Sequence, residues 1–183
     1  MKNLIMIVVI LNSLLLIGQE CKFETNEIDE FTNVEKKITQ SELYITHTDS
    51  ALLKYYTTKN RSYFELSINS AKINGLKVIY VTIRIDSDKA YKYYGSIAKD
   101  AEFMFKLTNG NTITLKSGAY DFGDINHNRG YTLYSTYLLL DEDNYKSFVN
   151  ISVDKVRIYW GEGYQDYLVN NPNVLIQQLK CIN

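Results

Sequence analysis

The chain has 183 residues, and its 20 lysines and arginines nearly balance 21 aspartates and glutamates, which gives a net charge of −1. This balance excludes a general electrostatic attraction to nucleic acid or to anionic lipid. Tyrosine accounts for 16 residues, proline occurs once, and neither a repeat nor a low-complexity tract is visible, so we expect one folded domain.

The N-terminal residues have the pattern of an export signal. Lys2 precedes an apolar run from Leu4 to Ile17, and Gly18 is small enough to precede a signal-peptidase site. Two polar residues interrupt the run, which is shorter than the roughly 20 residues of a membrane-spanning helix, so we favour cleavage over an uncleaved anchor. We therefore expect a signal peptide at 1–18, a single β-rich domain at 19–183 without membrane insertion, and a secreted, periplasmic or cell-envelope location.

The two cysteines, Cys21 and Cys181, lie at opposite ends of the mature domain. An even number of cysteines in an exported chain favours a disulfide, which would here close almost the whole domain into one loop. The chain-entropy model assigns such a bridge at most about 5 kcal/mol. The alternatives are two free thiols, or a lipid-modified Cys21, which the large polar residues before it disfavour.

Most of the mature chain has the alternating pattern of β-strands. In chain order the predicted strands are Leu43–Thr48, Leu52–Thr57, Ser62–Ser70, Lys77–Asp86, the two halves of Glu102–Lys116, Tyr131–Leu140, Ser152–Trp160 and Tyr164–Val169. Asn74-Gly75 and Asn109-Gly110 are typical of two-residue hairpin turns. Residues 19–40 are charged and weakly apolar, and we expect them to form an extended arm.

Two short helices interrupt the strands. Asp141 can cap a helix over Glu142–Val149, and Asn171-Pro172 is typical of a cap followed by proline in the first turn of a C-terminal helix. We predict a mainly β fold: an antiparallel β-sandwich-like domain with one short internal helix and a C-terminal helix. The alternative is one curved sheet that the two helices cover.

Short elements of the chain carry a resemblance to known proteins. They are the signal sequence with Cys21, the segment Asn26–Thr32, the strand residues Val156-Arg157-Ile158 and the closing Leu179-Lys180-Cys181. This layout resembles small secreted β-rich bacterial proteins with no assigned function. The resemblance implies an extracytoplasmic β-rich domain and supplies no catalytic residue.

One polar loop suggests a metal site. Asp124, Asn126 and Asn128 stand at alternate positions and can point three oxygens at one hard cation, so calcium is the one cofactor that the sequence suggests. The pattern departs from an EF-hand loop, because Arg129 stands where a glycine is needed and Ser135 where a bidentate glutamate belongs. The alternative interpretation is a polar loop between strands.

The sequence carries no recognisable catalytic motif. It has no Gly-x-Ser-x-Gly elbow, and its two histidines, His47 and His127, are too few and too distant for a zinc site. Because no constellation supplies both a nucleophile and a base, we expect a protein that is not an enzyme.

The surplus of tyrosine supports a recognition surface. An exposed tyrosine presents a flat apolar ring and a hydroxyl group, which suit sugars and protein partners. The candidate ligand-binding residues are Tyr91, Tyr93, Tyr94, Tyr164 and Tyr167. The alternative is that these rings pack within strands. Our hypothesis is an exported, non-enzymatic β-domain that binds a protein or glycan partner; an extracytoplasmic hydrolase and a structural envelope component are the other candidates.

Overall fold

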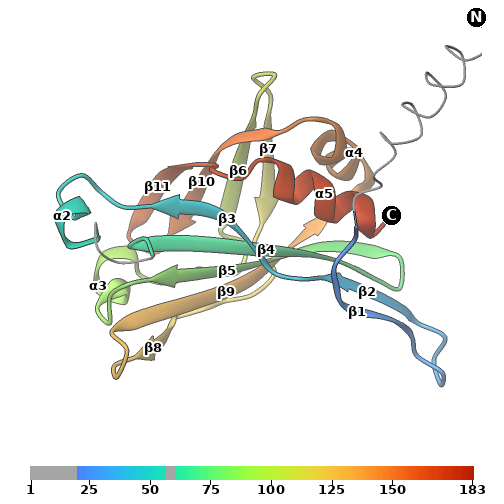
Figure 1. Ribbon diagram of the computed structural model, residues 1–183, viewed down its shortest axis with the longest axis horizontal. Coiled ribbons are helices and arrows are strands. Elements are labelled where there is room, and N and C mark those ends of the chain that lie inside the picture. Colours follow the sequence, from blue (N-terminus) through green and yellow to red (C-terminus); the bar gives the residue numbers. More distant parts are fainter. Residues whose placement is uncertain (1–19, 57–60) are drawn as a thin grey trace, which may run out of the picture.

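The computed structural model describes residues 20–56 and 61–183, in which two antiparallel sheets pack face to face in a sandwich-like arrangement (Figure 1). The predicted mainly β fold with an internal and a C-terminal helix is confirmed. The signal peptide predicted at residues 1–18 lies outside the described residues. Within those residues, every helix falls short of the length and hydropathy that crossing a bilayer requires.

The larger sheet has seven strands in the order β1-β2-β4-β5-β9-β8, and β3 also pairs with β4. Their bounds are β1 Phe23–Ile28, β2 Glu35–Thr39, β3 Glu42–His47, β4 Phe64–Ile73, β5 Leu76–Ile85, β8 Asp124–Asn126 and β9 Tyr131–Leu140. Strands β2 and β3 share one edge of β4: β2 pairs with its last residues and β3 with its first.

The β4–β5 hairpin sets the register of this sheet. Asn74 and Gly75 have φ angles of 49° and 80°, the left-handed conformation that a tight hairpin turn requires and that asparagine and glycine tolerate. The turn places Glu65 opposite Arg84. Over most of the hairpin, buried residues alternate with more exposed ones, so the buried residues face the core; near the turn, Ala71 and Val78 are buried on the opposite face as well.

The smaller sheet covers the inner face of the larger one. Its strands are β6 Glu102–Leu107, β7 Thr112–Lys116, β10 Val153–Trp160 and β11 Gly163–Leu168, in the order β11-β10-β6-β7. The inward rows of the two sheets form one core, in which the rings of Phe64 (β4) and Tyr167 (β11) stack at 4.0 Å. Burial of such apolar rings is the main source of stability in a sandwich.

The described residues contain four helices: α2 Leu53–Tyr56, α3 Ala90–Tyr94, α4 Glu142–Asn150 and α5 Asn173–Cys181. The predicted cap of α4 is confirmed, because Asp141 Oδ1 accepts the backbone N–H of Asn144 at 2.7 Å. The strand expected at Leu52–Thr57 is wrong: the carbonyl of Asp49 accepts two backbone N–H groups and turns the described part of this segment into α2.

The start of α5 also differs from expectation. Asn171 does not cap the helix; its side-chain amide donates to the carbonyl of Leu43 at 2.8 Å, which ties the segment before α5 to β3. Pro172 occupies the capping position. The helix then packs against β4 and α4, with Val174, Leu175 and Leu179 buried.

The predicted disulfide is confirmed: Cys21 and Cys181 are bonded, with their α-carbons 5.6 Å apart. A buried amide holds α5 in place beside it. Gln178 Nε2 donates to the carbonyls of Gln40 and Ile68 at 3.0 and 3.1 Å. These bonds fix the end of α5 against the junction of β2 and β3. A structural disulfide is consistent with an oxidising environment outside the cytoplasm.

The segment expected as an extended arm forms the β1–β2 hairpin. This hairpin projects from the body of the molecule in Figure 1. At its tip, Asp29 Oδ1 accepts the backbone N–H groups of Phe31 and Thr32, and the Phe31 side chain is 88% exposed. The charged composition of the segment hides this pairing from periodicity analysis.

Candidate functional site

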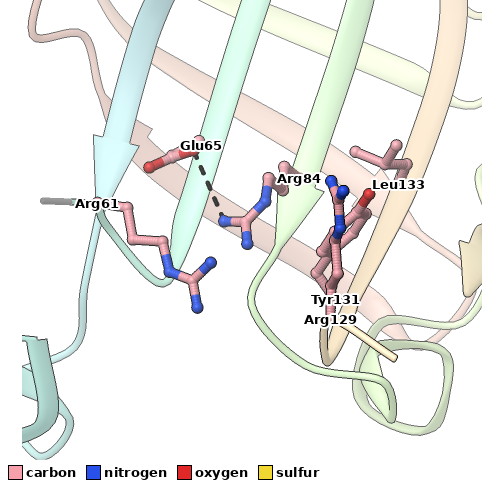
Figure 2. Close-up of a pocket in the computed structure, with 6 residues that line it drawn as sticks. All are labelled: Arg61, Glu65, Arg84, Arg129, Tyr131 and Leu133. Atoms are coloured by element: carbon pink, nitrogen blue, oxygen red, sulfur yellow. Dashed lines mark ion pairs between the residues drawn. The ribbon is translucent and has the colours of Figure 1, made fainter. Parts of the chain in front are cut away.

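The outer face of the larger sheet carries an open hollow of about 640 Å³ near the ends of three strands (Figure 2). One cross-strand row, Glu65–Arg84–Leu133, forms part of its floor. Tyr131, two residues before Leu133, lies on the same face of β9. Arg61 and Arg129 stand just before β4 and β9, so that three arginines line one depression.

A buried carboxylate organises two of these arginines. The side chain of Asp86, directly after β5, is only 4% exposed. Its Oδ1 lies 3.0 Å from Nη2 of Arg61 and 3.0 Å from Nη2 of Arg84, and its Oδ2 accepts the hydroxyl of Tyr56 at 2.7 Å. A shielded carboxylate is stable only with such partners, so Asp86 fixes both guanidinium groups.

Glu65 is the second acidic group of the hollow. Its Oε2 lies 3.7 Å from Nη1 of Arg84, the ion pair drawn in Figure 2, while its Oε1 accepts the backbone N–H of Ser62 at 2.9 Å. Arg84 also lies over the ring of Tyr131, 4.8 Å from its centroid. Arg84 is thus held from three sides, yet no described residue accepts a hydrogen bond from its Nη1.

Arg129 differs from the other two arginines. It is exposed on the β8–β9 turn, and across the described ranges no carboxylate forms an ion pair with it. Three guanidinium groups therefore meet two carboxylates here. None of the hollow residues is predicted from the sequence as a binding residue. Their one sequence signal is the Asn74-Gly75 turn, whose register already sets Glu65 opposite Arg84.

A separate cluster of exposed aromatic rings, the aromatic cluster, comprises Tyr91, Tyr120 and Phe122. Their side chains are 47%, 49% and 61% exposed. The ring centroids of Tyr120 and Phe122 are 4.3 Å apart, and those of Tyr91 and Phe122 are 6.4 Å apart. Single exposed aromatics are common on protein surfaces, but three adjoining rings form a contiguous apolar patch.

The backbone around the aromatic cluster is fixed. Asp121 exchanges two backbone hydrogen bonds with Ile97, and its carboxylate accepts the N–H groups of Gly123 and Ser135. Gly123 has a φ of 84°, and an added β-carbon would lie 2.7 Å from a methyl of Thr132. The rings on either side of Asp121 are therefore presented by a rigid segment.

The structure separates the five predicted ligand-binding tyrosines. Tyr91 belongs to the aromatic cluster, and Tyr93 is exposed on the same helix, α3. Tyr164 is exposed on β11, where Arg157 lies 4.1 Å from its ring centroid. Tyr94 and Tyr167 are buried, at 6% and 1% exposure, so their rings are not available to a partner.

Core packing explains these two burials. Tyr94 packs on Trp160 with ring centroids 5.1 Å apart, and Tyr167 stacks on Phe64. Burial raises the pKa of both hydroxyls above the ordinary tyrosine value. Sequence reasoning could not find Tyr120 and Phe122, because they lie in a loop without periodicity.

The candidate calcium residues lie on and beside β8. Asp124 and Asn126 share one face of this short strand, and Asn128 follows in the turn. The amide oxygen of Asn126 accepts the backbone N–H of Arg129 at 3.0 Å, which is the local turn bonding of the alternative interpretation. In the described ranges, no three His, Cys, Asp or Glu side chains gather as metal ligands. The calcium site stays a prediction.

The two histidines bear on the hydrolase hypothesis. His47 Nε2 lies 3.0 Å from Asp49, and His127 Nδ1 lies 3.6 Å from Asp88. In neither place does a serine hydroxyl hydrogen-bond the imidazole, as far as residues 20–56 and 61–183 show. Each pair is exposed to solvent and lies outside the arginine-lined hollow.

Comparison with known proteins yields no match to a family model, to a curated protein or to a solved structure.

Proposed function

We propose that this chain is an exported, non-enzymatic binding domain and that the aromatic cluster is its contact surface for a protein or glycan partner. The observation that carries the proposal is the contact of Tyr91, Phe122 and Tyr120 at the surface. Aromatic rings with hydroxyl groups contribute large contact areas at low entropic cost, and they are enriched where proteins bind partners.

The rigidity of the patch supports binding rather than chance exposure. Tyr120 donates its hydroxyl to Ser96 Oγ at 2.8 Å, and the backbone bonds of Asp121 fix the neighbouring residues. A preorganised surface loses little conformational entropy when a partner binds. Export is supported by the N-terminal pattern and by the Cys21–Cys181 bridge, which suits a secreted, periplasmic or cell-envelope location.

The proposal is tested by a surface double variant, Tyr91→Ser with Phe122→Ser. Both rings are exposed, so we expect folding to be unchanged within about 0.5 kcal/mol. The mature protein, its double variant and a Tyr164→Ser control are applied to a glycan array and used to recover partners from fractionated native host cells. The control removes an equally exposed tyrosine from another element.

We expect a glycan or protein that binds the wild type and the Tyr164→Ser control but not the double variant. Equal retention of that partner by the double variant would place the contact surface elsewhere and refute the role of the cluster.

A further inference from the structure

We propose that the arginine-lined hollow on the outer face of the larger sheet binds the oxyanion group of a small organic ligand, a carboxylate or a phosphate ester. This site is distinct from the aromatic cluster, and the inference does not depend on the function proposed for that cluster.

The hollow carries an excess of positive charge. Arg61 and Arg84 share the carboxylate of Asp86, and Glu65 reaches Arg84 only at 3.7 Å. Arg129 adds a third positive charge, for which the described residues supply no carboxylate. Since the chain as a whole is slightly acidic, this local excess of positive charge is a property of the hollow rather than of the general surface.

The arginines of the hollow have unused hydrogen-bonding capacity. A guanidinium group has five N–H donors, and among residues 20–56 and 61–183 the hydrogen-bond acceptor of the Arg84 side chain is Asp86 Oδ1, at Nη2. Its Nη1 is shielded from solvent, and in the described part of the chain Glu65 approaches it only to 3.7 Å, too far for a hydrogen bond, which is costly for a charged donor. Arg61 and Arg129 are exposed at the rim, so their remaining donors are open to a ligand.

The arginines of the hollow are preorganised. Asp86 and the Tyr131 ring fix the direction of the Arg84 side chain, and Asp86 also holds Arg61. The planar fork of arginine matches the paired oxygens of carboxylates and phosphates. Tyr131 and Leu133 supply an apolar surface beside the charged groups, which suits an organic body attached to the oxyanion.

The test compares three ligands that share one sugar body. Glucuronate carries a carboxylate, glucose 6-phosphate carries a phosphate ester, and glucose is neutral. Each is titrated into the mature protein at constant ionic strength, while the arginine Nε–Hε resonances are followed by NMR. Inorganic phosphate in a fourth titration distinguishes a site for any free phosphate from one that also uses the organic body.

We expect saturable shifts of the arginine resonances of the hollow with glucuronate or glucose 6-phosphate, and none with glucose. Arg129→Ala should raise the dissociation constant about tenfold or more, and Arg129→Lys should keep part of the affinity. Lys99→Ala is the matched control, because it removes an exposed charge outside the hollow and should leave binding unchanged. Heteronuclear spectra of each variant verify its fold.

Three results would overturn the proposal. They are the absence of saturable shifts with both charged sugars up to tens of millimolar, equal shifts with glucose, and equal weakening by Arg129→Ala and Lys99→Ala. Tight binding of inorganic phosphate alone would keep the oxyanion site and remove the organic body from the proposal.

Discussion

The two ends of the larger sheet satisfy their polar groups in different ways. At the α5 end, the neutral side chains of Gln178, Ser70 and Thr39 are buried and bond to one another and to backbone carbonyls. At the other end, charged side chains surround Asp86, and within the described residues Arg84 Nη1 has no hydrogen-bond acceptor and Arg129 forms no ion pair.

This difference gives the α5 end a structural role and the end with the hollow a binding role. The α5 network is closed by bonds within the protein and lies beside the disulfide, so its role is to hold the chain ends together. The arginine-lined hollow is partly open and has more donors than acceptors. An incomplete network at the surface has capacity for a ligand, whereas a complete buried network has none.

The largest expected effect is a loss of stability at high pH, which acts on the core that both ends share. Burial raises the pKa of Tyr134 to about 12 and also raises the pKa of Tyr44 above its ordinary value of 10.0. Above pH 10 the unfolded chain loses these protons while the folded chain keeps them, so stability is full below pH 10 and falls as pH rises toward 12. We expect both ends to unfold together in this pH range. Circular dichroism monitors the unfolding, and absorbance at 295 nm monitors the ionisation of tyrosine. Ionisation of the buried rings without unfolding would contradict this expectation.

The next effect belongs to the α5 end. The double variant Cys21→Ser with Cys181→Ser removes a bridge between residues 160 apart in sequence, and we expect a loss of about 3 to 5 kcal/mol in the free energy of unfolding. Urea unfolding of both proteins measures it. An unchanged midpoint would show that α5 and its contacts hold the chain ends without the bridge.

A smaller loss in the free energy of unfolding is expected from Gln178→Leu, which keeps the shape of the side chain but removes its amide. The carbonyls of Gln40 and Ile68 and the hydroxyl of Ser70 then lose their partner, at a cost of about 2 kcal/mol. The same urea experiment measures the loss, and an equally stable variant would mean that water replaces the amide.

The corresponding change at the hollow is Asp86→Asn. It leaves Arg61 and Arg84 without their shared charge, but both arginines reach solvent, so we expect a loss of only about 1 to 2 kcal/mol. Oxyanion affinity should rise, because the hollow becomes more positive. NMR titration with glucose 6-phosphate measures this rise, and weaker binding would show that Asp86 acts mainly by positioning the arginines.

Much of the fold could be predicted because its signals are local. The alternation in β4 and β5, the Asn74-Gly75 turn and the cap at Asp141 each depend on neighbouring residues. The β1–β2 hairpin was missed since its charged residues show no apolar face, and α2 was missed since aromatic residues favour strands in isolation.

The sites depend on long-range pairing and were harder to predict. Arg61, Arg84 and Arg129 are far apart in the sequence, and only the pairing of β4, β5 and β9 brings them to one hollow. Tyr94 and Tyr167 face the core because of the sheet packing, which a count of tyrosines cannot show. Conversely, Phe122 joins Tyr91 through a loop whose path is set by Asp121.

We propose that the α5 end holds the structure together while the arginine-lined hollow binds a ligand. This division of roles is tested most directly by ligand-induced stabilisation, measured as the free energy of urea unfolding with and without glucose 6-phosphate at equal ionic strength. At ten times its dissociation constant, a ligand that binds only the folded state adds about 1.4 kcal/mol. We predict this increment for the wild type and for Gln178→Leu, although the latter is less stable. At the same ligand concentration we predict a fall to about 0.4 kcal/mol or less in Arg129→Ala, whose own stability is unchanged. A full increment in Arg129→Ala, or its disappearance in Gln178→Leu, would contradict the account.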